Sequence, residues 1–198
     1  VNYAAGCGES SGLLNLAAQI DKNGNTLVLD GGDSLQGTPL VQYYLAHADE
    51  FPHHPVAEAF NAMGCDYFTL GNHDFNFGYD ALRAYLCAMD GVCLCANVQD
   101  LGGVLPLLPE TVHTLKNGLR SGITGIVTDY VNVWEQPQNL KKLRRIFSVM
   151  GSKHRKMTDH FHSQHILFRR KTQYLQLKQT DMAHQKRIFK QRLICFII

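Results

Sequence analysis

A polar turn in the first half of the chain carries residue types that could bind a metal ion or a phosphate group. Residues 66–70 are apolar, aromatic and β-branched apart from their first position, which predicts a short buried strand. Gly71 permits a tight turn, and Asn72, His73 and Asp74 then supply an amide oxygen, an imidazole and a carboxylate. Ligand sites of open α/β sheets lie at the carboxyl ends of their strands. These four residues taken alone fit either such a site or a polar turn with a hydrogen-bonded histidine.

A second stretch of the same design favours the site. The apolar residues 26–29 precede Asp-Gly-Gly-Asp-Ser-Leu-Gln-Gly-Thr-Pro at 30–39, so Asp33 follows a neighbouring predicted strand. Divalent cations that activate water take carboxylate, amide-oxygen or imidazole ligands. Asp33 and Asn72 are such groups, 39 residues apart. Together they predict a metal site at one edge of the sheet.

Residues 32–39 and 71–78 resemble, in type, order and spacing, the calcineurin-like dimetal phosphoesterases of the 5′-nucleotidase and 2′,3′-cyclic-nucleotide 2′-phosphodiesterase family. The resemblance implies an α/β fold, a four-layer αββα sandwich of which this chain would be a part. It also implies hydrolysis of nucleotide phosphoesters by water attack across two divalent metal ions, of the group Zn, Mn, Mg, Co and Fe. Intact members of such a family are expected outside the cell, in the periplasm or at the cell surface.

The resemblance assigns a role to each site residue. Asp33 matches the carboxylate that bridges both metals, and Asn72 matches the amide ligand of the second metal. His73 matches the histidine that meets the substrate phosphate without binding metal. Asp74 is the first candidate for orienting that imidazole, but some members use an acid at the position of Asn76, so the orienting group stays open. The loop at residues 134–137 also resembles nucleotidase relatives, and we expect it to be structural.

Other ligands of the family pattern are missing. An Asp-x-His on a first strand would be required, yet residues 1–25 contain no histidine. His160 and His162 are weak candidates for a Gly-His-x-His turn, because no glycine and no apolar strand precede them. The remaining histidines without motif context are expected at the surface or in loops: His47, His53, His54 and His113. We therefore expect an impaired fragment, incomplete at both ends. The alternatives are a phosphohydrolase for another phosphate ester or sugar nucleotide, and a non-catalytic remnant.

The distribution of charge divides the chain near residue 140. Residues 1–140 have 4 Lys/Arg and 15 Asp/Glu, whereas residues 141–198 have 15 Lys/Arg and 2 Asp/Glu. This division predicts a partial metallophosphoesterase domain at 1–140 and a basic tail at 141–198 that is foreign or frame-shifted rather than a native domain. We expect residues 150–198 to pack poorly on the rest. Basic segments often bind nucleic acid, but no binding module is recognisable here, so a nucleic-acid partner is not expected.

Helices and strands are expected to alternate up to residue 140, which predicts an α/β layered domain. The predicted helices span residues 11–20, 38–48, 55–63 and 79–89, with a basic one at 140–149, and the predicted strands span 26–30, 66–70, 92–96 and 122–128. No run reaches the ~18 apolar residues of a membrane span, and no signal sequence is visible. The six cysteines lack zinc-finger spacing and are expected to be buried free thiols.

Overall fold

A four-stranded parallel sheet lies at the centre of the computed structural model, which describes residues 13–37, 39–144 and 191–197. Its strands are β1 (Leu29–Asp30), β2 (Tyr67–Phe68), β3 (Val92–Leu94) and β5 (Leu107–Leu108), side by side in that order. Each of the first three strands ends in a loop at the same edge, because parallel strands share their direction. The sheet therefore gathers loops that are far apart in the sequence.

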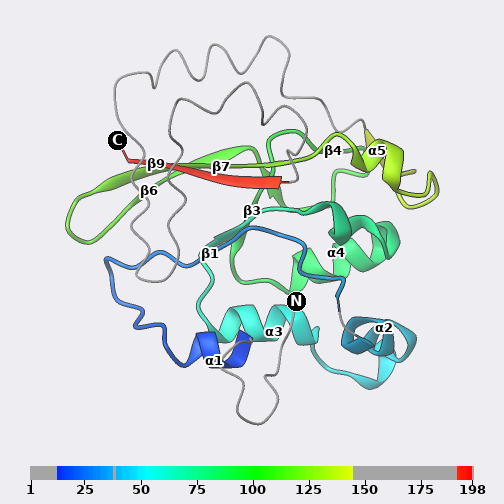
Figure 1. Ribbon diagram of the computed structural model, residues 1–198, viewed down its shortest axis with the longest axis horizontal. Coiled ribbons are helices and arrows are strands. Elements are labelled where there is room, and N and C mark those ends of the chain that lie inside the picture. The colour runs from blue at the N-terminus through cyan, green and yellow to red at the C-terminus, as the bar shows by residue number, and fades with distance from the viewer. Residues whose placement is uncertain (1–12, 38, 145–190, 198) are drawn as a thin grey trace, which may run out of the picture.

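The helices before and between the first three strands lie on one side of the sheet (Figure 1). They are α1 (Leu13–Ala17), α2 (Pro39–Ala46), the 3₁₀ turn η1 (Ala48–Glu50), α3 (Pro55–Ala62) and α4 (Gly78–Ala88). The start of α3 is set by Pro55 at its first position and by His54, whose Nδ1 accepts a hydrogen bond from Ala57 N at 3.5 Å. Gly64 follows its end with φ +66°, the left-handed conformation that glycine adopts without strain.

A second sheet covers the other face of the parallel sheet (Figure 1). It consists of β6 (Glu110–Thr114), β7 (Arg120–Val127) and β9 (Gln191–Ile197), all antiparallel. Gly125 on β7 permits close contact, because a Cβ there would lie 1.9 Å from the Leu94 carbonyl oxygen. Asn97, just after β3, joins the two sheets by donating to Val127 O (2.6 Å) and accepting from Val127 N (3.0 Å).

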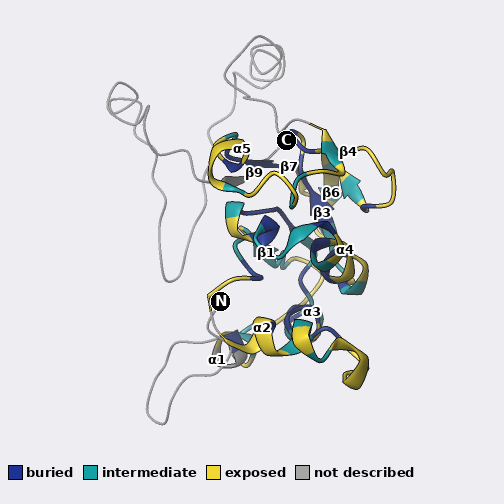
Figure 2. Ribbon diagram, turned by 90° about the vertical axis from the view of Figure 1, so that its right-hand side faces the viewer, coloured by how far each residue is buried: buried dark blue, intermediate teal, exposed yellow. Residues whose placement is uncertain are grey.

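The hydrophobic core fills the space between the helices and the parallel sheet, where buried segments of both lie (Figure 2). Its largest fully buried side chains include Phe68 of β2, Leu82 and Tyr85 of α4, and Leu94 of β3. Three of the four cysteines whose side chains the structure describes are buried free thiols, as expected: Cys65, Cys93 and Cys95. Cys87 is the exception, since it is exposed on α4.

The α/β class is confirmed, and the described residues form three layers in the order helices, parallel sheet, antiparallel sheet (Figures 1 and 2). The predicted helices before residue 90 are all present, with ends shifted by a few residues. The strands β4 (Gln99–Asp100), β5 and β6 were not predicted, because they are short or mostly exposed on one face.

Two expectations about the basic part of the chain are wrong where the structure describes it. The predicted helix at 140–149 is contradicted by β8 (Leu143–Arg144), which pairs antiparallel with β4. The backbone there makes its hydrogen bonds to a strand distant in the sequence instead of within a helix. Poor packing was expected of residues 150–198, yet Gln191–Ile197 forms β9 along most of β7. An apolar, β-branched segment suits that position beside a buried strand. Residues 145–190 lie outside the described part of the chain, so the boundary predicted at residue 140 stays a prediction.

Candidate active site

Two loops meet backbone to backbone at the carboxyl ends of β1 and β2. The register pairs Leu29 with Tyr67 and Asp30 with Phe68, so both loops leave the sheet at the same level. A Cβ on Gly32 would lie 2.4 Å from Gly71 N, and a Cβ on Gly71 would lie 2.1 Å from Asp33 Oδ1. Neither distance is possible for a real side chain. The two glycines are therefore required for the contact, and the contact brings Asp33 beside the second loop.

Asp33 occupies an unusual backbone conformation for a residue with a side chain. Its φ is +63°, in the left-handed region that costs a non-glycine residue on the order of 1 kcal/mol. Asp33 is the sole non-glycine residue with positive φ among those described. Its Oδ1 accepts a hydrogen bond from His73 N at 3.0 Å. The strained backbone thus holds a carboxylate against the turn that carries Asn72 and His73.

Asp74 fixes the two loops to each other. Its Oδ1 accepts from Ser34 N (2.8 Å) and Leu35 N (2.9 Å), and its Oδ2 accepts from Asp33 N (3.0 Å) and Gly71 N (2.7 Å). The carboxyl group is buried, and burial raises its pKa while the amide donors lower it. All four partners are N–H donors, which only the ionised carboxylate can satisfy completely. Asp74 is therefore a clamp made of backbone hydrogen bonds.

His73 is exposed and takes its orientation from another residue. The turn Asn72–Phe75 is a short 3₁₀ helix, η2, and Asn76 follows directly after it. His73 Nδ1 lies 2.9 Å from Asn76 Oδ1, and Asn76 Nδ2 donates in turn to Glu135 Oε2 at 2.6 Å. Of the two orienting positions left open by the sequence, the structure gives the hydrogen bond to Asn76, because both oxygens of Asp74 are engaged by backbone amides.

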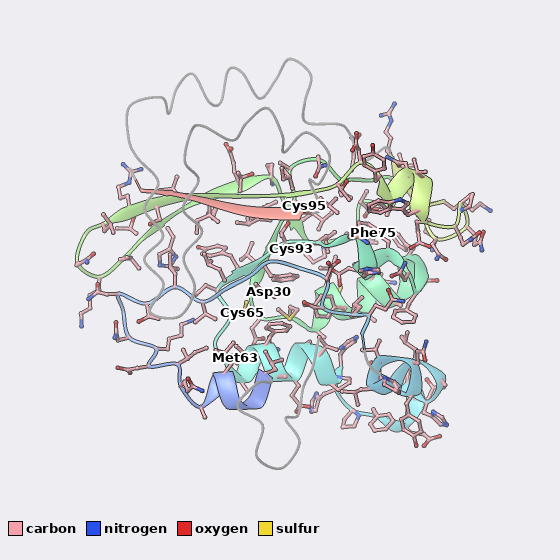
Figure 3. All side chains as sticks on the ribbon, in the orientation of Figure 1. Asp30, Met63, Cys65, Phe75, Cys93 and Cys95 are labelled. Carbon is pink, nitrogen blue, oxygen red and sulfur yellow. The ribbon has the colours of Figure 1, made fainter. Side chains whose placement is uncertain are left out.

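Asp30 is a second acidic group that supports the first loop, and sequence reasoning gave it no role. Its Oδ2 accepts from Ser34 Oγ at 2.9 Å and from Gly32 N at 3.1 Å. Burial raises the pKa of Asp30 to about 6, and the nearby Asp74 carboxylate adds to that rise. Figure 3 places Asp30 in the interior, between the helices and the antiparallel sheet. The sequence signal that could have identified Asp30 was its carboxylate at the end of an apolar run.

The side chains near the two loops fit part of a metal site. Asp33 offers a carboxylate and the partly exposed Asn72 offers an amide oxygen, both of them hard ligands for divalent ions. No group of three or more His, Cys, Asp or Glu side chains in the described ranges is placed to hold a metal ion. His160 and His162 lie outside those ranges. The donors present therefore fit a divalent metal but do not complete a site by themselves.

Comparison with known proteins finds nucleotide phosphoesterases among the relatives of this chain. The chain is 32% identical over 145 residues to the trifunctional nucleotide phosphoesterase protein YfkN of Bacillus subtilis, an alignment that covers 67% of this chain and 10% of that protein. It is 32% identical over 122 residues to a 2′,3′-cyclic-nucleotide 2′-phosphodiesterase/3′-nucleotidase of Salmonella typhimurium, covering 57% and 19%. The crystal structure of the calcineurin-like phosphoesterase YfkN superposes with a TM-score of 0.57 at 26% identity, covering 76% of this chain and 48% of that one.

Homologues of this chain are 5′-nucleotidases and 2′,3′-cyclic-nucleotide phosphodiesterases, and its structural neighbours are calcineurin-like phosphoesterases. These proteins are metal-dependent hydrolases. No model of a protein family matches the chain in a scan of such models. The chain spans about 10 to 22% of the length of three curated relatives that it matches. No helix in the described ranges is long and apolar enough to cross a membrane.

The structure gives two residues more contacts than the sequence indicated. Glu135 was expected in a structural loop, but it contacts Asn76 from the segment after α5 (Val131–Trp134). His54 lies in the loop before α3, as expected, but it is buried rather than at the surface, with its ring 4.7 Å from Tyr44 and 5.4 Å from Tyr85. Neither could be found from the sequence, because their partners are brought close only by the packing of separate elements.

Proposed function

We propose that the loops carrying Asp33 and Asn72–His73 form part of the active site of a metal-dependent hydrolase of nucleotide phosphoesters, of the 5′-nucleotidase or 2′,3′-cyclic-nucleotide phosphodiesterase type. The observation that carries the proposal is the hydrogen bond from His73 N to Asp33 Oδ1 at 3.0 Å. It brings a carboxylate beside an amide and an imidazole at the ligand-binding edge of an α/β sheet. The similarity to nucleotide phosphoesterases supports the substrate class.

Each side chain has a distinct part in the proposed reaction. Asp33 would bind two metal ions at once, because an anionic bridge screens two neighbouring cations, and Asn72 would bind the second ion through its amide oxygen. Divalent ions held there would supply an attacking water and neutralise charge on the phosphoryl group. His73, oriented by Asn76 through Nδ1, would face a phosphoryl oxygen or the leaving group with Nε2, and would donate a hydrogen bond there, where negative charge develops, in the form that carries hydrogen on both ring nitrogens. Asp74 would act indirectly, by keeping the two loops together.

The activity of the 198-residue chain itself is expected to be low. Asp33, Asn72 and His73 are at most three of the residues that the resemblance requires around the metals. Weak metal binding and slow turnover should follow. Fast turnover that a chelator abolishes would show that residues outside the described ranges complete the site. Export from the cell, which the resemblance implies for intact members, belongs to the same proposal.

Metal binding tests the site without relying on turnover. The full chain would be titrated with Mn²⁺ and the free ion measured by electron paramagnetic resonance. Asp33→Ala should weaken binding at least ~10-fold, because the loss of a group that only hydrogen-bonds to a metal ligand already costs about that much. Asp21→Ala, at an exposed acidic residue before β1, should leave binding unchanged. His73→Ala should also retain the metal. Equal binding by the parent chain and Asp33→Ala would refute the metal site.

Turnover of three substrates tests the reaction and the substrate class. Rates on 5′-AMP, 2′,3′-cyclic AMP and an aryl phosphate would be compared with Mn²⁺ present and after chelation. The proposal expects metal-dependent hydrolysis of the nucleotides, lowered by His73→Ala. Equal rates on all three would support the alternative, a phosphohydrolase without nucleotide selectivity. Hydrolysis that survives both chelation and His73→Ala would refute the proposed mechanism.

A further inference from the structure

A chain of polar side chains leads from His73 to the segment after α5. His73 Nδ1 lies 2.9 Å from Asn76 Oδ1, and Asn76 Nδ2 lies 2.6 Å from Glu135 Oε2. The other oxygen of Glu135 accepts from Asn139 Nδ2 and from Gln136 N, both at 2.8 Å. Asn76 and Glu135 are 59 residues apart in the sequence. A carboxylate from a separate segment therefore stands directly behind the group that orients the histidine.

The direction of each hydrogen bond in this series of side chains follows from which atoms can donate and which can accept. An ionised Glu135 carboxylate only accepts hydrogen bonds, so the Asn76 atom that faces it must be the NH₂ group. The Asn76 carbonyl oxygen must then face His73, and it also only accepts. The ring nitrogen next to it, Nδ1, is therefore the one that carries the hydrogen. The neutral His73 ring leaves Nε2 unprotonated and turned away from Asn76.

The hydrogen-bond donors around Glu135 fix the orientation of the Asn76 side-chain amide. Asn139 Nδ2 donates to the backbone oxygen of Asn76 at 3.1 Å as well as to Glu135 Oε1. Glu135 thus meets three N–H donors, which fix it as an acceptor on both oxygens. Reversing the Asn76 amide would aim a carbonyl oxygen at a carboxylate oxygen 2.6 Å away, which is strongly repulsive.

We propose that Glu135 is a positioning residue that sets the tautomer of His73 through the amide of Asn76. Glu135 holds the Asn76 NH₂ group, the Asn76 carbonyl holds the hydrogen on His73 Nδ1, and Nε2 is left to face the substrate side. The importance of this tautomer for catalysis rests on the proposed function, in which His73 meets the phosphoryl group. The tautomer itself depends only on the contacts between these side chains.

Replacing Glu135 by glutamine should reverse the tautomer. The NH₂ group of the introduced side chain cannot face Asn139 Nδ2 and Gln136 N, because both are donors, so it must face Asn76. The Asn76 amide then turns over to accept from it and presents its own NH₂ group to His73. His73 Nδ1 must become the acceptor, and the hydrogen moves to Nε2. A merely structural tie between the two segments predicts no such change.

The experiment is ¹H–¹⁵N correlation spectroscopy of the full chain with ¹⁵N-labelled histidine, at a pH of about 9 where imidazole rings are neutral. Protonated and unprotonated ring nitrogens have separate ¹⁵N shifts, and the signals missing from His73→Gln identify His73. The parent chain should show the Nδ1–H form, and Glu135→Gln should show the Nε2–H form. Glu58→Gln, at an exposed glutamate of α3, is the matched control and should resemble the parent chain.

A double variant distinguishes the effect of Glu135 on the His73 tautomer from simple damage to the loop. When Asn76→Asp is combined with Glu135→Gln, the new amide donates to the new carboxylate, whose other oxygen accepts from His73 Nδ1. The Nδ1–H form should therefore return. An Nε2–H form in the parent chain, or an unchanged Nδ1–H form in Glu135→Gln, would overturn the inference.

Turnover distinguishes this inference from the proposed function. Nucleotide hydrolysis should fall in Glu135→Gln mainly through kcat, because an Asn76 NH₂ group beside Nδ1 disfavours the ring with hydrogen on both nitrogens, and it should recover in the double variant. If the tautomer changes as expected while nucleotides are hydrolysed at the same rate by the parent chain, by Glu135→Gln and by the double variant, the placement of Glu135 is supported and the role of His73 in the proposed function is refuted.

Discussion

Asp74→Asn is the sharpest test of how the two loops are held together. The substitution keeps the shape of the side chain and replaces one carboxylate oxygen by an NH₂ group. If that group takes the place of Oδ1 it faces Ser34 N and Leu35 N, and if it takes the place of Oδ2 it faces Asp33 N and Gly71 N. In either orientation two backbone amides lose their acceptor and meet another donor instead.

The size of the effect follows from those two lost acceptors. Hydrogen bonds to a charged group contribute about 1.5–3 kcal/mol each, so Asp74→Asn should lower the free energy of unfolding by about 3–6 kcal/mol. Domains of this size are stable by about 5–15 kcal/mol in total. The variant should therefore be close to unfolded, or folded with the two loops separated.

Urea unfolding of the full chain, followed by circular dichroism, measures this difference. Asp80→Asn is the matched control, because Asp80 is also an aspartate next to the same loop but 85% of its side chain is exposed. Its ion pair with Lys142 spans 3.3 Å at the surface and contributes less than about 1 kcal/mol. A free energy of unfolding for Asp74→Asn within about 1 kcal/mol of the parent, the scale of a single hydrogen bond, would refute the clamp.

Two further predictions concern packing and pH. Gly71→Ala would place a Cβ 2.1 Å from Asp33 Oδ1 and should cost about 1–3 kcal/mol of stability in urea unfolding, whereas Gly31→Ala, with no heavy atom within 4 Å, should be nearly neutral. Equal effects of the two would contradict the close approach of the loops. Burial lowers the pKa of His54 from 6.5 to about 4, so between these pH values the unfolded chain takes up a proton that the folded chain does not. The free energy of unfolding that His54 contributes is present above pH 6.5 and falls by about 3 kcal/mol as the pH drops to 4. His54→Asn keeps a hydrogen-bond acceptor for Ala57 N and should lose this dependence of stability on pH. Parallel pH profiles of the free energy of unfolding in the parent chain and in His54→Asn would contradict the prediction.

The sequence by itself determined the helices before residue 90 and the strands that precede the two candidate loops. Alternating apolar runs and helical segments predicted the α/β class, and the glycines beside Asp33 and before Asn72 predicted two tight turns at strand ends. These signals are local: strand propensity, helix caps and the need for left-handed backbone act within a few residues. The order and spacing of the two motifs also indicated the family.

The tertiary structure decided which groups act on which. Asp74 was a candidate for orienting His73, but the convergence of the two loops turns both of its oxygens to backbone amides and leaves His73 to Asn76. Glu135 reaches Asn76 across 59 residues. Such contacts carry no pattern in the sequence, because hydrogen-bond partners depend on where the packing of whole layers puts each loop.

The same reason explains the errors in the basic part of the chain. Residues 140–149 have a composition that suits a helix, and Gln191–Ile197 follows a long charged stretch. Each was judged by its own composition, yet β8 pairs with β4 and β9 pairs with β7. The pairing of strands depends on which backbone edge lies alongside, so it is settled by the tertiary structure rather than by the local sequence.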